Sequence, residues 1–538
     1  MINSISFNHY KAFDHGRIGL RPITILLGAN SVGKSSIIQL FLMLQQTAII
    51  NNSNKSTLIL NDDKIKLGDA TNIFRNKDTS KPLSITFELD DNYSYWFRRN
   101  IIDDFFKPIE LFYHCSPNIS EQVSQLRKHS WRKNREDFIL LIDAVINSTE
   151  ELHSFWEREH SLIAKEKETY LNAYDFIQRV NLTDTNATFY LTVDFQKHNK
   201  QNRIYVSKLS LYKNQSIVIE LSADRFYRPR FSLISDFYNN NNDFCSEDYQ
   251  KQIHSVIPDL SINLFNLLSK MPSDSFFSEE RNELSPLIKL LLSSFEGALK
   301  SLKASFNIEN INYVSPLRAF PQRYYFLDRT HVSSSLDTLD GESVIEIIKE
   351  NQDIRQKVNV WLKHFGIEIN VEAIEEFIHK LKVNQNNLKL DITDVGFGIS
   401  QILPVIVQGF FARKDSLTVI EQPEVHLHPK MQADLADLFI DIALPKGQNG
   451  VRSVNKYLLV ETHSEYLLKR LRRRIATKEI SPSDVGIYII RSQDVNKESI
   501  IEDMTITPSG SFPWPEEFYG GELLQDTLEY LKAQAEIE

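Results

Sequence analysis

Residues 23–41, ITILLGANSVGKSSIIQLF, decide how this sequence is interpreted. Gly28 and Gly33 bracket four residues, and Lys34 and Ser35 follow, which spells the phosphate-loop pattern G-x-x-x-x-G-K-S. The apolar run before the loop predicts a buried strand, and the apolar spacing after it predicts a helix. The glycines let backbone N–H groups turn around phosphate oxygens, while the lysine reaches the outer phosphates and the serine ligates Mg²⁺.

The composition is that of an ordinary globular protein. The 538 residues are 42% hydrophobic and 25% charged, and the net charge is −10, so contact with nucleic acid requires a local basic patch or a partner protein. No run approaches the roughly 18 apolar residues of a membrane span, and the first residues lack a signal pattern, so we expect a cytoplasmic protein without a membrane partner. The two cysteines, Cys115 and Cys245, are too far apart to predict a disulfide scaffold or a cysteine zinc site.

The distribution of glycine indicates the domain organisation. None of the 17 glycines lies between Asp69 and Glu296, so tight turns and phosphate cradles belong to the two ends of the chain. The middle contains charged helical segments, followed by three alternating runs that predict an antiparallel meander at residues 187–195, 203–212 and 215–223. We therefore expect an α/β fold whose phosphate-binding part is drawn from the two ends of the chain, with a largely helical insertion at 116–304.

A second glycine-rich segment precedes another predicted helix. Gly396 and Gly398 stand just before Ser400, after which apolar residues resume helical spacing. A helix N-terminus of this kind can bind phosphate, although a plain turn before a buried helix is an equal alternative from these residues alone.

Two further apolar runs each deliver an acid at their end. Residues 417–420 lead into Glu421, and residues 457–460 lead into Glu461, with His463 shortly after. A carboxylate at the end of a buried strand is how a nucleotide site holds Mg²⁺ opposite a phosphate loop. The sequence therefore favours a site assembled from strand ends.

Four motifs of this chain resemble those of the ABC-type ATPase heads of the SMC, RecF and OLD group. They are the phosphate loop, GFGISQ at 396–401, IEQPEVHLHP at 420–429 and ETHSE at 461–465. Within this group they are most similar to AAA15-type ATPases, including the ATPase subunits of Septu-type antiphage systems, some of which are associated with retrons. The resemblance covers about residues 1–115 and 305–538.

The resemblance implies an oligomer in which two heads sandwich ATP and Mg²⁺. The residues implied to bind ATP from one head are Gly28, Ala29, Asn30, Ser31, Val32, Gly33, Lys34, Ser35 and Ser36. Those implied to contact the γ-phosphate from the other head are Gly396, Gly398 and Ser400. The implied metal ligands are Ser35 and Glu421, and His463 is the implied switch residue that senses the γ-phosphate.

The sequence departs from the usual ABC pattern at one position. Most ABC-type heads carry Asp-Glu at the end of the acidic strand, whereas this chain has Glu421 and Gln422. An amide cannot act as a general base. Either Glu424 or Glu461 takes that role from a shifted position, or ATP is held for long periods; we expect slow hydrolysis, with the catalytic set drawn from Glu421, Gln422, Glu424 and His463.

Other segments allow more than one interpretation. Glu424, His426 and His428 have metal-ligand chemistry, but we favour a loop beside the acidic strand because no separate third ligand group is visible. The basic runs 127–135, around Trp131, and 469–474 can touch nucleic-acid phosphate or simply end helices. We expect Trp131 to be packing rather than stacking on bases.

The resemblance implies a function in defence against phage. We expect an ATPase subunit that regulates an HNH-type nuclease subunit, with a reverse transcriptase and its RNA–DNA product as further partners and with nucleic acid reached through those partners. The alternatives are a self-contained OLD-like nuclease and a RecF/SMC-like DNA-repair ATPase. Only 75 residues follow His463, too few for a typical nuclease domain beside the remaining head elements. The helical segments between residues 120 and 180 are too short for a long coiled coil.

Overall fold

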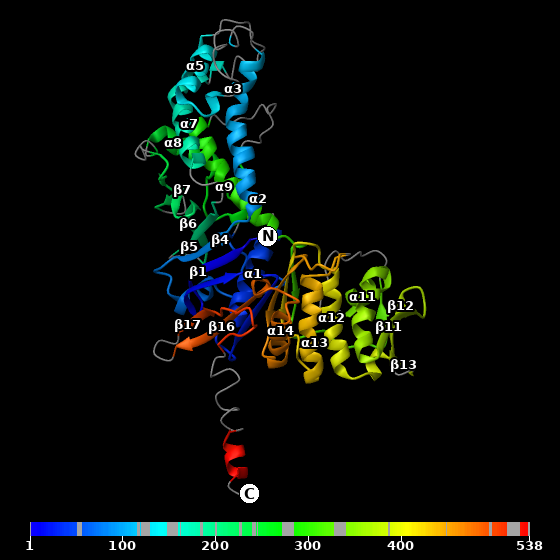
Figure 1. Ribbon diagram of the computed structural model, residues 1–538. Helices are drawn as coiled ribbons and strands as arrows, with labels where there is room; N and C mark the ends of the chain where they lie inside the picture. The colour runs from blue at the N-terminus through cyan, green and yellow to red at the C-terminus, as the bar shows by residue number, and fades with distance from the viewer. Residues whose placement is uncertain are drawn as a thin grey trace. The chain divides into compact units, whose positions relative to one another are not determined.

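A computed structural model describes most of the chain (Figure 1). The described residues are 2–50, 56–115, 119, 130–147, 160–161, 163–182, 187–198, 202–224, 229–238, 244, 246–271, 284–327, 341–385, 388–447, 449–493, 498–513 and 528–535. They form two compact units. The first, called the P-loop unit, contains residues 1, 10–45 and 305–538, and the second, called the middle unit, contains residues 2–9 and 46–304.

The P-loop unit is built on a sheet with the strand order β17-β16-β3-β15-β14-β9. Its strands are β3 (Ile23–Gly28), β9 (Ile311–Val314), β14 (Leu417–Glu421), β15 (Tyr457–Glu461), β16 (Val485–Gln493) and β17 (Glu498–Asp503). All neighbouring pairs are parallel except β16 and β17, which are antiparallel. Every residue of β3 is buried, which explains its continuous apolar sequence, because a central parallel strand is covered on both faces.

Helices enclose this sheet and bury a large apolar core. They are α1 (Lys34–Ile49), α10 (Gly341–Glu350), α11 (Gln352–Leu362), α12 (Phe397–Phe411), α13 (Pro429–Ala443) and α14 (Glu465–Ala476). Figure 1 shows α12, α13 and α14 side by side. The core unites strand residues such as Ile25 and Val460 with helix residues such as Leu403 and Leu438, all at 0–3% exposure. Burial of each such side chain stabilises the fold by about 1.5–3 kcal/mol.

Smaller elements complete the P-loop unit. A second sheet has the order β10-β12-β11, with β13 also paired to β12. Its strands are β10 (Tyr325–Phe326), β11 (Ile367–Ala373), β12 (Ile378–Gln385) and β13 (Leu388–Asp391), and β2 (Phe13–Gly19) precedes β3. Residues 528–535 form a final short helix.

The middle unit contains an antiparallel sheet and several helices. The part of the sheet that belongs to this unit runs β1-β4-β5-β6-β7-β8. Its strands are β1 (Ser4–Tyr10, whose last residue belongs to the P-loop unit), β4 (Leu83–Glu88), β5 (Phe189–Lys197), β6 (Ile204–Lys213), β7 (Ser216–Ala223) and β8 (Phe231–Ile234). The helices are α2 (Asp91–Trp96), α3 (Asp103–Cys115), α5 (Arg135–Ile146), α7 (Lys167–Leu182), α8 (Glu247–Val256) and α9 (Pro286–Ser305).

The predicted α/β class, phosphate-loop core and antiparallel meander are confirmed, the last by the consecutive pairing of β5, β6 and β7. The division into units differs from the expected boundary in the N-terminal third. Residues 46–115, expected in the head, join the middle unit, because β4 pairs with both β1 and β5 in one antiparallel sheet. Within the described residues, no helix is both long enough and apolar enough to cross a membrane.

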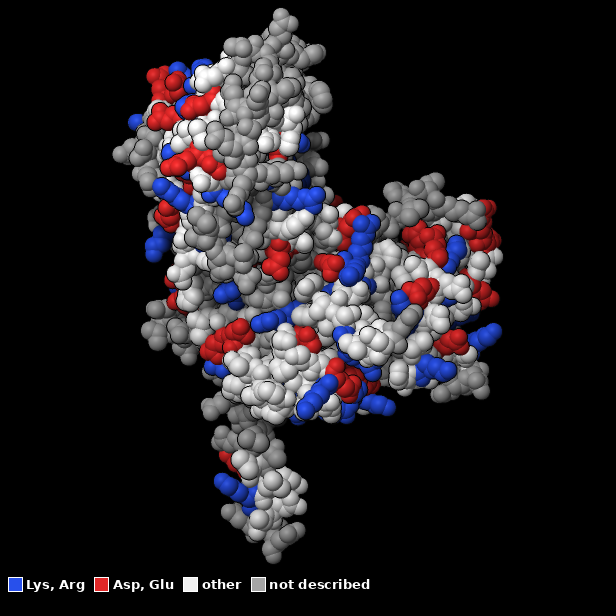
Figure 2. Space-filling model, turned by 45° about the horizontal axis from the view of Figure 1, so that its top comes forward, with Lys and Arg blue, Asp and Glu red and all other residues white. Residues whose placement is uncertain are grey.

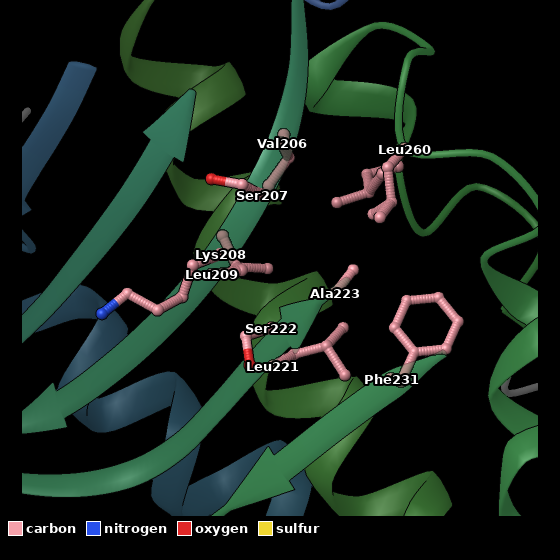
Figure 3. A pocket seen from close by; sticks show the side chains of 10 residues that line it. Val206, Ser207, Lys208, Leu209, Leu221, Ser222, Ala223, Phe231 and Leu260 are labelled. Atoms are coloured by element: carbon pink, nitrogen blue, oxygen red, sulfur yellow. The ribbon is translucent and has the colours of Figure 1, made fainter. Parts of the chain in front are cut away.

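A small pocket lies in the middle unit, between β6, β7, β8 and the loop at Leu260 (Figure 3). Its wall includes Leu209, Leu221 and Phe231. Lys208 points away from these apolar side chains in Figure 3, and its ammonium group pairs with Asp194 and Glu220. Among the described residues that line this pocket, no charged group points into it, so it does not have the character of a phosphate site.

Candidate nucleotide site

The phosphate loop connects β3 to α1 and has a backbone that requires its glycines. Gly28 has φ +149°, and a Cβ there would meet the carbonyl oxygen of Ile490 at 2.4 Å. Gly33 has φ +110°, and a Cβ there would meet Cζ of Phe13 at 2.8 Å. Both conformations are strained for L residues, so the two glycines of the motif are needed for the shape of the loop.

The loop places its polar atoms where a phosphate can reach them. Ala29, Asn30, Ser31 and Ser35 are exposed, whereas Val32 and Lys34 are buried. The ammonium group of Lys34 donates to the carbonyl oxygens of Gly28 and Ala29 at 3.0 and 2.7 Å. The lysine therefore lies across its own loop, at the N-terminus of α1, where the helix dipole also favours an anion.

Glu421 and Glu461 lie next to each other across β14 and β15, as register partners in the parallel sheet. Burial raises the pKa of Glu421, and burial together with the neighbouring Glu421 raises the pKa of Glu461 to about 7. Lys34 lies 3.7 Å from Glu461, and burial lowers the pKa of this lysine while Glu461 opposes that effect. Two carboxyl groups held together in this way favour a proton or a cation between them.

Two residues associated with β9 contact the end of β14. The Tyr313 hydroxyl donates to Oε1 of Glu421 at 2.6 Å. Arg318, which is 5% exposed, donates through Nη2 to the carbonyl oxygens of Glu421 and Gln422 at 2.8 and 3.2 Å. These contacts fix the carboxylate and the turn that follows it.

The turn after β14 brings Glu424 back toward the site. Gln422 has φ +45°, and its backbone N–H donates to the carbonyl oxygen of Glu461 at 2.8 Å. Oε1 of Glu424 accepts a 2.6 Å hydrogen bond from the backbone N–H of His463, whereas Oε2 is buried without a hydrogen-bond partner. Burial raises the pKa of Glu424 and lowers the pKa of His463, which favours a neutral imidazole.

The residues of this site fit a nucleoside triphosphate bound with a divalent cation. The phosphate loop offers backbone N–H groups and a lysine, and Ser35 and Glu421 offer the oxygen ligands that Mg²⁺ prefers. Buried oxygen atoms of Glu424 and Glu461 lack hydrogen-bond partners, as expected where a ligand completes the site. A bound Mg²⁺ supplies positive charge against the phosphate oxygens.

The match to known proteins agrees with this geometry. The profile of the AAA ATPase domain family (AAA_15) matches residues 1–468. The chain belongs to this family. A search of curated proteins found no match. Among solved structures, the AAA ATPase is similar to an SMC head domain from Thermotoga maritima, with 7% sequence identity, a TM-score of 0.34, and coverage of 93% of this chain and 98% of the other.

The glycine turn of this AAA ATPase, residues 396–400 at the start of α12, is only partly open. Gly396 is exposed, and a Cβ there would meet no atom within 4 Å. A Cβ at Gly398 would meet the carbonyl oxygen of His426 at 2.9 Å, and Ser400 is 8% exposed. The three residues predicted to contact ATP bound to a second head therefore differ in their exposure to solvent. Their role in such a contact stays a prediction.

Glu424, His426 and His428 do not bring three potential ligand atoms together in the described part of the AAA ATPase. Glu424 bonds to His463, and the His428 side chain caps α13 by accepting from the N–H of Lys430. Among the described residues, only Asp14, His15 and Glu498 bring three potential ligand atoms within 4.8 Å of one another. The interpretation of 424–428 as a loop beside the acidic strand is the one that fits.

Several described residues of the two basic runs make ion pairs within the chain. Trp131 is fully buried against Phe106, as expected, and residues 127–129 lie outside the described residues. In α14, Arg470 and Arg474 both pair with Asp437. On the face shown in Figure 2, basic and acidic side chains are interspersed over the described residues, so that face offers no broad basic area for nucleic acid.

The sequence revealed only part of the β9 end of the site. Tyr313 lies in a short strand with no motif around it. For Arg318 the sequence allows a brace of the nucleotide site, a subunit contact or a structural ion pair, and does not separate them. The long distance in sequence between β9 and β14 is the reason, because only the fold shows that these strands are neighbours.

Proposed function

We propose that this AAA ATPase binds ATP with Mg²⁺ and hydrolyses it slowly, as a cytoplasmic subunit of an antiphage defence complex. The observation that carries the ATPase part is the convergence of Lys34 with Glu421, Glu424 and Glu461 at the carboxyl edge of the sheet, shown by the ion pair and by the strand register. Slow turnover is supported by Gln422, because its amide stands where related heads carry the base.

The proposal includes pairing of two heads around ATP. Support comes from exposed groups of the P-loop unit near the site. Gly396 has open space around it, and Leu317 and Phe320, on either side of Arg318, are 78% and 75% exposed. Contiguous exposed apolar surface marks sites that another protein covers, and these two side chains would contribute to such a surface; a second copy of the chain is the partner that the ATP sandwich requires.

The defence role rests on the resemblance of the four motifs to Septu-type ATPase subunits. In this proposal the chain controls an HNH-type nuclease subunit, and head pairing with ATP keeps the nuclease restrained until infection releases it. A reverse transcriptase with its RNA–DNA product is a further proposed partner. The motifs of the chain support a regulatory subunit that binds ATP and a separate subunit that cleaves nucleic acid. They fit binding of phosphate and metal rather than cleavage of a phosphodiester bond.

The direct experiment is a nuclease assay of the isolated chain, with native copurification in parallel. Plasmid, single-stranded DNA and transfer RNA are incubated with the protein, ATP, and Mg²⁺ or Mn²⁺. We expect no cleavage by the chain alone, and recovery of a nuclease subunit from the native host by mass spectrometry.

Cleavage that follows the protein through purification and disappears in Glu424→Ala and His426→Ala would instead favour a self-contained OLD-like nuclease. Recovery of DNA-repair proteins in place of a nuclease subunit would favour a RecF/SMC-like repair ATPase.

A further inference from the structure

Arg318 is a buried arginine with unused hydrogen-bond donors. Its side chain is 5% exposed, and only Nη2 is engaged, with the carbonyl oxygens of Glu421 and Gln422. Nε and Nη1 are buried without a hydrogen-bond partner. A buried donor on a charged group that lacks a hydrogen-bond partner destabilises the folded protein, so two of them call for a physical reason.

The position of Arg318 in the fold places it at the ligand-binding edge of the sheet. It follows β9, which is parallel to β14; β14 is parallel to β15, and β15 is parallel to β3. The carboxyl ends of these four strands therefore lie on one edge, where parallel α/β sheets bind their ligands. The phosphate loop, Glu421 and Glu461 occupy the same edge.

The charged groups around Arg318 are arranged so that an anionic phosphate can bind between Arg318 and Lys34. Glu424 interacts electrostatically with both Arg318 and Lys34, which places this carboxylate in the field of both basic groups. Burial lowers the pKa of Arg318 to about 10, which leaves it cationic at neutral pH. A guanidinium group is well suited to phosphate oxygens because its donors are fixed in a plane and its charge persists.

We propose that Arg318 recognises the terminal phosphate of the nucleotide with its unpaired Nε and Nη1 donors and thereby distinguishes a nucleoside triphosphate from a diphosphate. This inference rests on the proposed nucleotide site. The bond from Nη2 to the carbonyl oxygens of residues 421 and 422 holds the guanidinium in place before the ligand arrives. Arg318 then supplies a second positive group in addition to Lys34, from the segment that follows β9, the strand farthest along the sheet from the phosphate loop.

The competing explanation is that Glu424 is the true partner of Arg318. Oε2 of Glu424 is also buried without a hydrogen-bond partner, so a small movement could pair the two groups within the chain. In that case Arg318 would only hold the turn after β14 in place. Its loss would then affect triphosphate and diphosphate binding to the same extent, because no bond to the terminal phosphate would be removed.

Calorimetric titration with Mg²⁺ and either adenylyl imidodiphosphate or ADP separates these cases. We expect Arg318→Met to weaken binding of the triphosphate analogue by about tenfold to a hundredfold, the range of one charged hydrogen bond, and to change ADP binding less than about twofold. Arg318→Lys keeps the charge and should restore part of the difference. The matched control is Arg323→Met, since Arg323 is exposed and pairs with Asp394.

Equal losses for both nucleotides, or no loss for either, would overturn the assignment of Arg318. Retained ADP binding also shows that the Arg318→Met variant is folded. If Arg318→Met does not fold, the ratio of triphosphate-analogue affinity to ADP affinity in Arg318→Lys, compared with that in the parent, tests the role of Arg318 instead. A parent protein that binds neither nucleotide would contradict the proposed function itself. A parent that binds both, with an unchanged ratio in the variants, would contradict only the role of Arg318.

Discussion

The backbone N–H of His463 donates a 2.6 Å hydrogen bond to Oε1 of Glu424. This bond joins the segment after β15 to the turn after β14 and leaves Oε2 of Glu424 as the oxygen without a partner. The neighbouring Gln422 has no basic form, so Glu424 is the side chain of this turn that can accept a proton from water.

We therefore expect Gln422→Glu to raise kcat for ATP hydrolysis and Glu424→Gln to lower it. A positioned general base contributes about a hundredfold or more to rate, and the first substitution supplies one while the second removes one. Phosphate release measured at saturating ATP checks both, with Glu372→Gln, at an exposed position of β11, as a control. Unchanged kcat in Glu424→Gln would show that this carboxylate is not the base.

The carboxyl pair at the sheet edge predicts a pH dependence of stability. The pKa of Glu461 is raised to about 7 in the folded protein, against about 4.5 ordinarily, so the folded state binds more protons between these values. Stability contributed by this group is therefore present below about pH 4.5 and is lost as the pH rises toward 7.

We expect Glu461→Gln to remove this dependence, which is of the order of 1–3 kcal/mol, because the amide does not ionise. The measurement is the free energy of unfolding of the metal-free and nucleotide-free protein at pH 5 and pH 8. The relevant quantity is the difference between parent and variant. A difference that does not change with pH would contradict the prediction.

The phosphate loop predicts unequal costs for two glycine substitutions. Gly28→Ala forces a Cβ to within 2.4 Å of a backbone oxygen at φ +149°, so we expect a loss of about 1–3 kcal/mol in unfolding free energy. Gly396→Ala is the matched control, since a Cβ there meets nothing within 4 Å and its φ is −53°, so the change should cost less, at most about 1 kcal/mol through the weaker N-cap. Denaturant unfolding that gives equal costs would argue against the described loop geometry.

Head pairing is tested at the glycine turn. We expect ATP to shift the parent protein to a dimer in light scattering, and Ser400→Arg to prevent the shift because bulk and positive charge enter the shared phosphate surface. Ser400→Ala controls for loss of the hydroxyl alone. An oligomer that forms without ATP and persists in Ser400→Arg would count against the composite site.

The sequence predicted the parts of the site that are local in the chain. The loop from Gly28 to Ser35 could be identified because its glycine spacing is short and its flanking strand and helix are strongly apolar. Glu421 and Glu461 could be placed at strand ends for the same reason. What the local pattern could not give is their adjacency, which depends on β14 and β15 pairing in register.

The remaining parts depend on contacts between distant segments. Tyr313 reaches Glu421 across 108 positions of sequence, and Arg318 reaches Gln422 across 104. The expected boundary at residue 115 differs from the compact units because β4 is paired between β1 and β5, and β5 lies about a hundred residues later. Periodicity identifies a strand but not the strand that becomes its neighbour.

Binding of ATP to the parent and to Lys34→Ala, measured by isothermal calorimetry with Mg²⁺, tests the central claim most directly. Lys34 is the ammonium group of the phosphate loop, and its removal deletes the charge that meets the phosphates; Lys357→Ala, in an exposed pair with Asp353, is the control. The account predicts clear binding by the parent and the control, and a loss of about a hundredfold or more in Lys34→Ala with unchanged circular dichroism. Equal affinity for ATP in all three proteins would contradict it.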